Sequence, residues 1–171
     1  LAAACAGLCE GVSELGISSV LASFEGVEHR LEFVAELDGV RFVNDSIATT
    51  PERTQVAIES LSGRIVLIAG GYNKGLDYDR LGIDIGKRVS DLVLLGETAD
   101  TIAESVPQGR ATQIHRAESL ESALAISRGC ARSGDTVLFS PASASYDMFR
   151  NFADRGRLFK AMVKEMGVIG A

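Results

Sequence analysis

The chain has 171 residues, of which 46% are hydrophobic and 23% are charged, with a formal net charge of −6 and a pI near 5.0. These values are ordinary for one soluble globular domain with a full hydrophobic core. The acidic balance, without any cluster of lysine and arginine, argues against nucleic acid as the main partner, because binding its phosphates requires concentrated positive charge.

The cysteines and apolar runs indicate the cellular compartment. The three cysteines, Cys5, Cys9 and Cys130, are an odd number and form no CxxC pair. They predict neither a disulfide framework nor a zinc site, and they favour the cytoplasm. No apolar run reaches the roughly 20 residues of a membrane helix, and the start lacks the basic segment of a signal peptide. Because the first residue is Leu1 rather than Met, we expect a piece of a longer protein.

The start of the chain predicts two helices. Residues 1–15 are rich in alanine and have a helical pattern, which Gly16 is placed to stop. Residues 17–24 predict a second, shorter helix.

A β-hairpin and then alternating strands and helices follow. The strand-like runs 31–37 and 40–43 enclose Asp38-Gly39, which is a strong signature of a two-residue turn. Further apolar runs alternate with helix-like stretches. The apolar runs are 64–69, 92–95, 111–114 and 136–139. The helix-like stretches are 51–61, 78–89, 98–106, 120–131 and 148–166. This alternation predicts a doubly wound α/β domain with a mostly parallel, Rossmann-like sheet and the N-terminal β-hairpin at its start or edge.

Ligands of such sheets bind at the carboxyl ends of the strands, so the segments that follow the strands are candidate sites. The first, 44–51, reads Asn-Asp-Ser-Ile-Ala-Thr-Thr-Pro and opens a helix. One interpretation is structural, with Thr49 as the helix cap and Glu52 completing a capping box. The other is functional, because Asp45 can accept hydrogen bonds from ribose hydroxyls and a helix N-terminus can bind an anion.

The second segment, 70–77, reads Gly-Gly-Tyr-Asn-Lys-Gly-Leu-Asp. Its glycines allow a ligand to approach the backbone, and Lys74 supplies a movable positive charge. The alternative is a flexible turn with a solvated lysine. The chain contains neither the GxxxxGK[ST] loop nor the GxGxxG fingerprint of nucleotide-binding domains.

The third segment, 140–147, reads Ser-Pro-Ala-Ser-Ala-Ser-Tyr-Asp and precedes a predicted helix. Its hydroxyls, with the N–H groups of a helix start, can hold a carboxylate. Alternatively, Ser145 or Asp147 only caps the helix. Ser140 does not lie in the GxSxG motif of hydrolases.

His29-Arg30, just before the hairpin, has two interpretations. It is a surface or packing pair, or Arg30 stacks on a base or pairs with a phosphate. His115 has no companion residue and receives no role.

Together, these segments resemble the Mur ligase family, and within it the branch that adds D-glutamate. The matching residues follow one another in order over nearly the whole chain: 24–30, 44–49, 70–71, 74–77, 140–142, Ser145, Asp147, Phe149, Asn151, Phe152 and 155–156. The Asn-Asp-Ser run separates this branch from the other members, in which a motif with tyrosine and histidine is usual.

The resemblance implies a three-domain ATP-dependent ligase of peptidoglycan synthesis, which joins D-glutamate to UDP-N-acetylmuramoyl-L-alanine through an acyl phosphate. Residues 1–16 are then the last helix of a central ATP-binding domain, and residues 17–171 are the C-terminal, amino-acid-binding domain, inactive alone. The implied partners are ATP, both substrates and the protein's own N-terminal and central domains, with neither nucleic acid nor membrane. Mg²⁺ is expected to be held mainly by the central domain, and no metal ligand is assigned in this chain.

The resemblance also implies residue roles. Three residues are implied to bind the nucleotide: Arg30, Asn44 and Asp45. Five are implied to bind D-glutamate, among them Lys74 as a catalytic residue: Thr49, Lys74, Ser145, Tyr146 and Phe152. The chain departs from many relatives at Ile47, where lysine is common, so a positive charge is lost there or supplied by another residue.

Two alternatives stay open. One is a related ligase for another substrate, such as a folylpolyglutamate synthase. The other is a non-catalytic α/β module that binds a nucleotide or a partner protein. A GxxxxGK[ST] loop in upstream sequence would favour a ligase.

Overall fold

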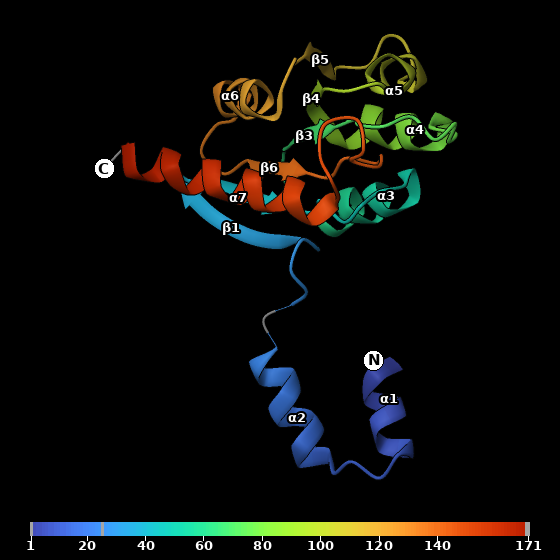
Figure 1. The fold of residues 1–171 in the computed structure, drawn as a ribbon, viewed down its shortest axis with the longest axis vertical. Helices are drawn as coiled ribbons and strands as arrows, with labels where there is room; N and C mark the ends of the chain where they lie inside the picture. The colour runs from blue at the N-terminus through green and yellow to red at the C-terminus, as the bar shows by residue number, and fades with distance from the viewer. Residues whose placement is uncertain (1, 25, 170–171) are drawn as a thin grey trace.

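The computed structural model describes residues 2–24 and 26–169. An α/β domain is preceded by the helices α1 (Ala2–Cys9) and α2 (Glu14–Ser23), which lie apart from it in Figure 1 and have no buried residues. Leu1, Glu25, Gly170 and Ala171 lie outside the described residues. The sequence pattern places Leu1 in the first predicted helix, Glu25 in a matching motif and the last two residues at the end of the domain. None of the described helices combines the length and hydropathy of a membrane span.

The single helix predicted over residues 1–15 is wrong. The chain turns after α1 because Gly11 has a φ of 80°. Ser13 then caps α2, its side chain accepting a hydrogen bond from the Gly16 N–H at 3.2 Å. Gly16 therefore lies inside α2 and does not stop a helix.

The domain is built on a six-stranded sheet with the order β1-β2-β6-β3-β4-β5. Its strands are β1 (Glu32–Leu37), β2 (Val40–Asn44), β3 (Ile65–Ala69), β4 (Val89–Leu94), β5 (Gln113–Arg116) and β6 (Thr136–Phe139). The edge strand β1 is antiparallel to β2, and the other pairings are parallel. Asp38 and Gly39 join β1 to β2 with φ of 50° and 74°, which a two-residue turn of this kind requires. The predicted sheet with its N-terminal hairpin is confirmed.

Helices cover both faces of the sheet. One core contains residues of α3 (Pro51–Ser60), α4 (Asp79–Arg88) and α5 (Ala99–Ser105). The other contains residues of α6 (Leu120–Cys130) and α7 (Phe152–Ile169). Strand β3 contributes Ile65 and Leu67 to the first core and Val66 and Ile68 to the second, as a strand buried on both faces must.

Three elements of the α/β domain differ from their predicted bounds by more than one residue. Strand β4 begins at Val89, directly after α4, and β5 begins at Gln113. The helix predicted over 148–166 begins only at Phe152. Asn151 ends the preceding turn, because its Oδ1 accepts a hydrogen bond from the Asp154 N–H at 2.8 Å and so satisfies a free donor of the first helical turn.

Candidate functional site

The loops that follow β2, β3 and β6 meet at the carboxyl edge of the sheet. The Asp45 N–H donates to the Phe139 carbonyl at 2.8 Å, and the Gly70 N–H donates to the Pro141 carbonyl at 2.8 Å. These bonds hold the three candidate segments together at the place where open α/β sheets bind ligands.

A cavity of about 270 Å³ lies between the start of the hairpin and α3. It is lined by Arg30, Leu31, Asp45, Ile47, Ala48, Glu52, Arg53, Val56 and Ala57. Its volume is close to the lower end of the range for small-molecule sites, roughly 300–1,000 Å³. Its charged lining residues are two exposed cations, Arg30 and Arg53, and two carboxylates, Asp45 and Glu52, so the cavity can contact both an anionic group and the hydroxyl groups of a ligand.

Asp45 is the buried acceptor of this cavity. It is 4% exposed, and its two carboxylate oxygens accept hydrogen bonds from the Leu31 N–H at 3.1 Å and the Ser140 hydroxyl at 2.7 Å. Burial raises the pKa of Asp45 above its ordinary value, although these two bonds and the charges of Arg30 and Arg53 act in the opposite direction. Each oxygen keeps a lone pair for a ligand hydroxyl.

Asn44 lies beside the cavity without lining it. The side chain is fully buried, its Nδ2 donates to Glu32 Oε2 at 3.0 Å, and its Oδ1 accepts from the Ser46 N–H at 3.1 Å. The Asn44 Nδ2 also lies 2.9 Å from Nδ1 of His29, which is 2% exposed. His29 is therefore a packing residue, whereas its neighbour Arg30 faces the cavity.

Lys74 and Tyr146 form an exposed surface on the glycine-rich loop and the loop after β6. The Lys74 Nζ lies 5.7 Å from the centroid of the Tyr146 ring. Tyr146 is 64% exposed, and its ring also meets that of Tyr72 edge to face at 6.2 Å between centroids. An ammonium over an aromatic face is a weakly held cation, free to contact an anionic ligand.

The other implied D-glutamate residues lie in the surrounding loops. Thr49 is half-buried in the turn before α3, and the N-cap is Thr50, so the proposed cap at Thr49 is wrong. Phe152 starts α7, and its carbonyl accepts a hydrogen bond from the Ser46 hydroxyl at 2.7 Å. Among the described residues, no hydrogen bond joins Thr49 or Phe152 to Lys74.

Ser145 is 2% exposed, and its carbonyl accepts hydrogen bonds from the Met148 and Phe149 N–H groups at 3.2 and 2.8 Å. Because α7 begins at Phe152, the interpretation of Ser145 or Asp147 as its cap is wrong. The hydroxyl of Ser145 therefore has no capping role at α7.

A family model shows to which protein family the chain belongs. The family model described as "Mur ligase, glutamate ligase domain" matches residues 29–143. The chain belongs to the Mur ligase family.

Two curated relatives illustrate the likeness to Mur ligases. The UDP-N-acetylmuramoylalanine–D-glutamate ligase of Acetivibrio thermocellus is 43% identical, covering 96% of this chain and 37% of its own length. The ligase of the same name from Pelotomaculum thermopropionicum is 45% identical, covering 95% of this chain and 36% of its own length. The chain thus spans little more than a third of these relatives.

Solved structures of two other enzymes share the fold. UDP-N-acetylmuramate-alanine ligase of Thermotoga maritima has a TM-score of 0.64 at 13% identity, over 95% of this chain and 36% of that one. The bifunctional folylpolyglutamate synthase/dihydrofolate synthase of Yersinia pestis has a TM-score of 0.64 at 16% identity, over 88% of this chain and 34% of that one.

Sequence reasoning assigned no role to Arg155 of this Mur ligase domain. Arg155 is 2% exposed, and its guanidinium donates to the carbonyls of Ser46, Ser143 and Ala144 at 2.9, 3.1 and 3.2 Å. Burial lowers its pKa to about 10, and the charge of Asp147 opposes this shift. Arg155 thereby joins the first and third segments. In the sequence, the only sign of this role was the place of Arg155 in a motif that matches the Mur ligase family, because an arginine in an amphipathic helix is usually exposed.

A hydroxyl network joins the second and third segments. Ser143 Oγ lies 2.9 Å from both Tyr78 Oη and Thr98 Oγ1. Thr98 Oγ1 in turn accepts a hydrogen bond from the Gly71 N–H at 3.1 Å. The four residues are buried, so this network fixes the backbone on which Lys74 is carried.

We expect Gly70→Ala to destabilise the chain by about 3 kcal/mol or more. Gly70 has a φ of 113°, and a Cβ there would lie 2.0 Å from the Leu95 carbonyl oxygen. The matched control is Gly75→Ala, where φ is 68° and nothing lies within 4 Å of the added Cβ. That change is expected to cost only about 1–2 kcal/mol of backbone strain. Urea unfolding of both variants measures the difference, and equal losses would contradict the close packing at Gly70.

Proposed function

We propose that this chain is the C-terminal, amino-acid-binding part of an ATP-dependent ligase that joins D-glutamate to UDP-N-acetylmuramoyl-L-alanine in cytoplasmic peptidoglycan synthesis. The supporting observation is its 41–45% identity, over 94–97% of its length, to relatives that all carry the name UDP-N-acetylmuramoylalanine–D-glutamate ligase. Residues 1–16, which hold α1 and the first turn of α2, then belong to the central domain, and residues 17–171 form the C-terminal domain. Alone, the chain is inactive, because it has no GxxxxGK[ST] loop to hold ATP phosphates.

The Asp45 cavity suits the nucleotide. Its buried carboxylate accepts hydrogen bonds from the ribose hydroxyls, and the exposed guanidinium of Arg30 pairs with a phosphate or stacks on the base. Asn44 holds the backbone around Asp45 in place, because its Oδ1 accepts a hydrogen bond from the N–H of Ser46, the residue after Asp45.

Arg53 compensates for the lysine that many relatives have at position 47. Ile47 and Arg53 both line the cavity, and Arg53 Nη1 donates to the Ile47 carbonyl at 3.0 Å. This bond holds the Arg53 guanidinium next to Ile47 in the lining of the cavity, where it supplies a positive charge to the ligand.

D-glutamate binds between the Lys74 surface and the loop after β6. Lys74 and Thr49 contact one carboxylate. Ser145 and the backbone near Phe152 contact the other, with Tyr146 beside the amino acid. An ammonium without an acidic partner among the described residues offers its full charge to a carboxylate ligand.

The reaction has two stages. The substrate carboxylate attacks the γ-phosphorus of ATP, which forms an acyl phosphate and releases ADP. The D-glutamate amine then attacks the acyl carbon, loses a proton, and the tetrahedral intermediate expels phosphate to leave the amide. This chain orients the amine and excludes water, which would hydrolyse the acyl phosphate. Mg²⁺, which neutralises phosphate charge, is held mainly by the central domain.

We expect Asp45→Ala to raise the KM for ATP more than the KM for D-glutamate, roughly tenfold to hundredfold for ATP. The reason is the loss of hydrogen bonds to a charged acceptor, worth about 1.5–3 kcal/mol. Steady-state kinetics of the parent protein with each substrate varied in turn measures the two values. A larger rise in the KM for D-glutamate would show that Asp45 does not hold the ribose.

The choice of acceptor tests the proposal against a folylpolyglutamate synthase. The parent protein is supplied with ATP and with both D- and L-glutamate, together with either UDP-N-acetylmuramoyl-L-alanine or tetrahydrofolate, and the products are identified by mass spectrometry. We expect a glutamyl adduct of the UDP-linked acceptor only. An adduct of tetrahydrofolate would establish the alternative, and no adduct of either acceptor would favour the non-catalytic module.

A further inference from the structure

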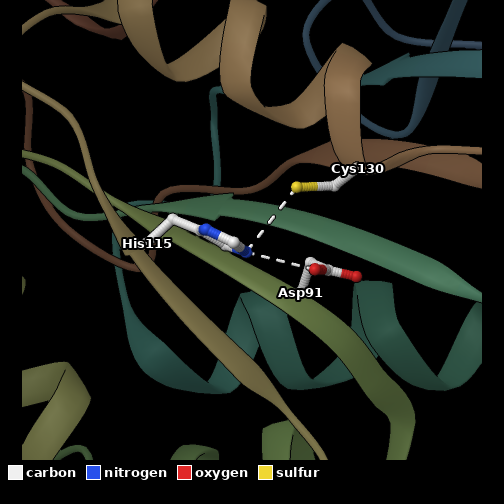
Figure 2. Close-up of side chains that lie close together, drawn as sticks. All are labelled: Asp91, His115 and Cys130. Carbon is white, nitrogen blue, oxygen red and sulfur yellow. Dashed lines mark hydrogen bonds and ion pairs between the residues drawn. The ribbon is translucent and has the colours of Figure 1, made fainter.

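Three potential metal ligands converge away from the carboxyl edge of the sheet. Figure 2 shows Asp91 of β4, His115 of β5 and Cys130 at the end of α6 pointing toward one another. Asp91 precedes the carboxyl end of β4 at Leu94 by three residues, which is about 10 Å along a strand. The cluster is therefore separate from the candidate ligase site.

The spacing of the donor atoms fits a tetrahedral metal ion. His115 Nε2 lies 3.1 Å from Asp91 Oδ1 and 3.6 Å from Cys130 Sγ, and all three donor atoms lie within 4.8 Å of one another. With zinc–sulfur bonds of about 2.3 Å and zinc–nitrogen or zinc–oxygen bonds of about 2.0–2.2 Å, tetrahedral angles place sulfur and nitrogen about 3.6 Å apart. Nitrogen and oxygen are then about 3.3 Å apart. The two shortest spacings of the cluster thus match without rearrangement of the backbone.

The same geometry excludes a catalytic triad. A nucleophile and its carboxylate must contact opposite nitrogens of the histidine ring. Here Cys130 and Asp91 both approach Nε2 of His115. Burial, together with the charge of Asp91, raises the pKa of Cys130, whereas an activated thiol has a lowered pKa.

The charges around the cluster favour a cation. Arg64 Nη2 donates to Asp91 Oδ2 at 2.6 Å, and Nη1 of the same guanidinium pairs with Asp135. Two carboxylates thus face one guanidinium, which leaves one negative charge, and the proton that Cys130 releases when it binds a metal ion leaves a second. The side chain of Asp91 is 9% exposed and that of His115 is 33% exposed, so the ion can enter from solvent.

We propose that Asp91, His115 and Cys130 bind a divalent transition-metal ion of the zinc class, with water as the fourth ligand. Thiolate and imidazole ligands select such ions over Mg²⁺ and Ca²⁺. The ion crosslinks β4, β5 and the end of α6, so its role is to stabilise the domain. Sequence spacing gave no sign of it, because His115 lies 24 residues from Asp91 and 15 from Cys130.

Cobalt titration of the metal-stripped parent protein tests the site, independently of ligase activity. We expect one equivalent of Co²⁺ to produce a thiolate-to-cobalt charge-transfer band, which Zn²⁺ abolishes by displacement. Cys130→Ser and His115→Asn are expected to lose the band. The matched control is Cys5→Ser/Cys9→Ser, which changes two exposed cysteines and is expected to keep the band. Circular dichroism establishes that each variant is folded.

Two results would overturn the proposal. One is a wild-type protein without the charge-transfer band, a result that does not depend on any variant folding. The other is an unchanged band in Cys130→Ser. A second readout is the midpoint of thermal unfolding, which Zn²⁺ is expected to raise in the wild type and in the Cys5→Ser/Cys9→Ser control, but not in His115→Asn.

Discussion

Lys74→Ala is expected to lower kcat/KM for D-glutamate by roughly tenfold to hundredfold, the effect of about 1.5–3 kcal/mol for a lost bond to a charged group. Lys74 is exposed on the glycine-rich loop, and its Nζ lies over the Tyr146 ring at 5.7 Å. The substitution removes the charge without opening a cavity in the core, so the midpoint of thermal unfolding is expected to stay within about 2 °C. Steady-state kinetics and a thermal scan of the same preparations measure both quantities.

Lys87→Ala is the matched control for Lys74→Ala. Lys87 has a half-exposed side chain and pairs with Asp84 at 3.6 Å on α4, outside the loops of the candidate site. Its loss is expected to leave kcat/KM unchanged and to alter stability by no more than about 0.5 kcal/mol. If both lysine variants kept wild-type kinetics, the D-glutamate contact assigned to Lys74 would be wrong.

Arg155→Met is expected to destabilise the chain by about 3 kcal/mol, or roughly 6–12 °C in the midpoint of thermal unfolding. Methionine fills much of the space but donates no hydrogen bond, so the carbonyls of Ser46 and Ser143 lose a buried donor. The loops after β2 and β6 are then no longer joined, and activity of the parent protein is expected to fall with stability. Differential scanning calorimetry measures the shift.

Arg157→Met tests whether burial of the arginine is the cause of the loss of stability expected for Arg155→Met. Arg157 lies on the same helix, but its side chain is 58% exposed, and it pairs with Asp154 at the surface at 2.6 Å. Such exposed pairs contribute about 0–1 kcal/mol, so only a small shift is expected. Similar shifts for the two arginine variants would contradict the bridging role of Arg155.

Most of the fold could be predicted because its signals are local. The turn at Asp38-Gly39 and the fully apolar strand 65–69 each depend on a few neighbouring residues. The start of α7 could not be predicted so closely, since the apolar pattern continues through the turn that Asn151 ends. The break between α1 and α2 depends on one positive φ at Gly11, which an alanine-rich stretch conceals.

The candidate site could be predicted only in part. The loops at strand ends, with Asp45 and Lys74, follow from the rule for parallel sheets. The buried role of Asn44 and the bridge formed by Arg155 depend on partners far along the chain, because Arg155 donates to Ser46 across 109 positions. The cluster of Asp91, His115 and Cys130 is likewise assembled by three separate elements.

Phosphate release from ATP by the full-length parent protein is the most direct test of the central claim. The protein is given UDP-N-acetylmuramoyl-L-alanine with D-glutamate, L-glutamate or another amino acid. We expect sustained release only with D-glutamate, and a release at least tenfold slower in Lys74→Ala. Release that depends on a different amino acid, or that none of them stimulates, would contradict the assignment of this chain to D-glutamate addition.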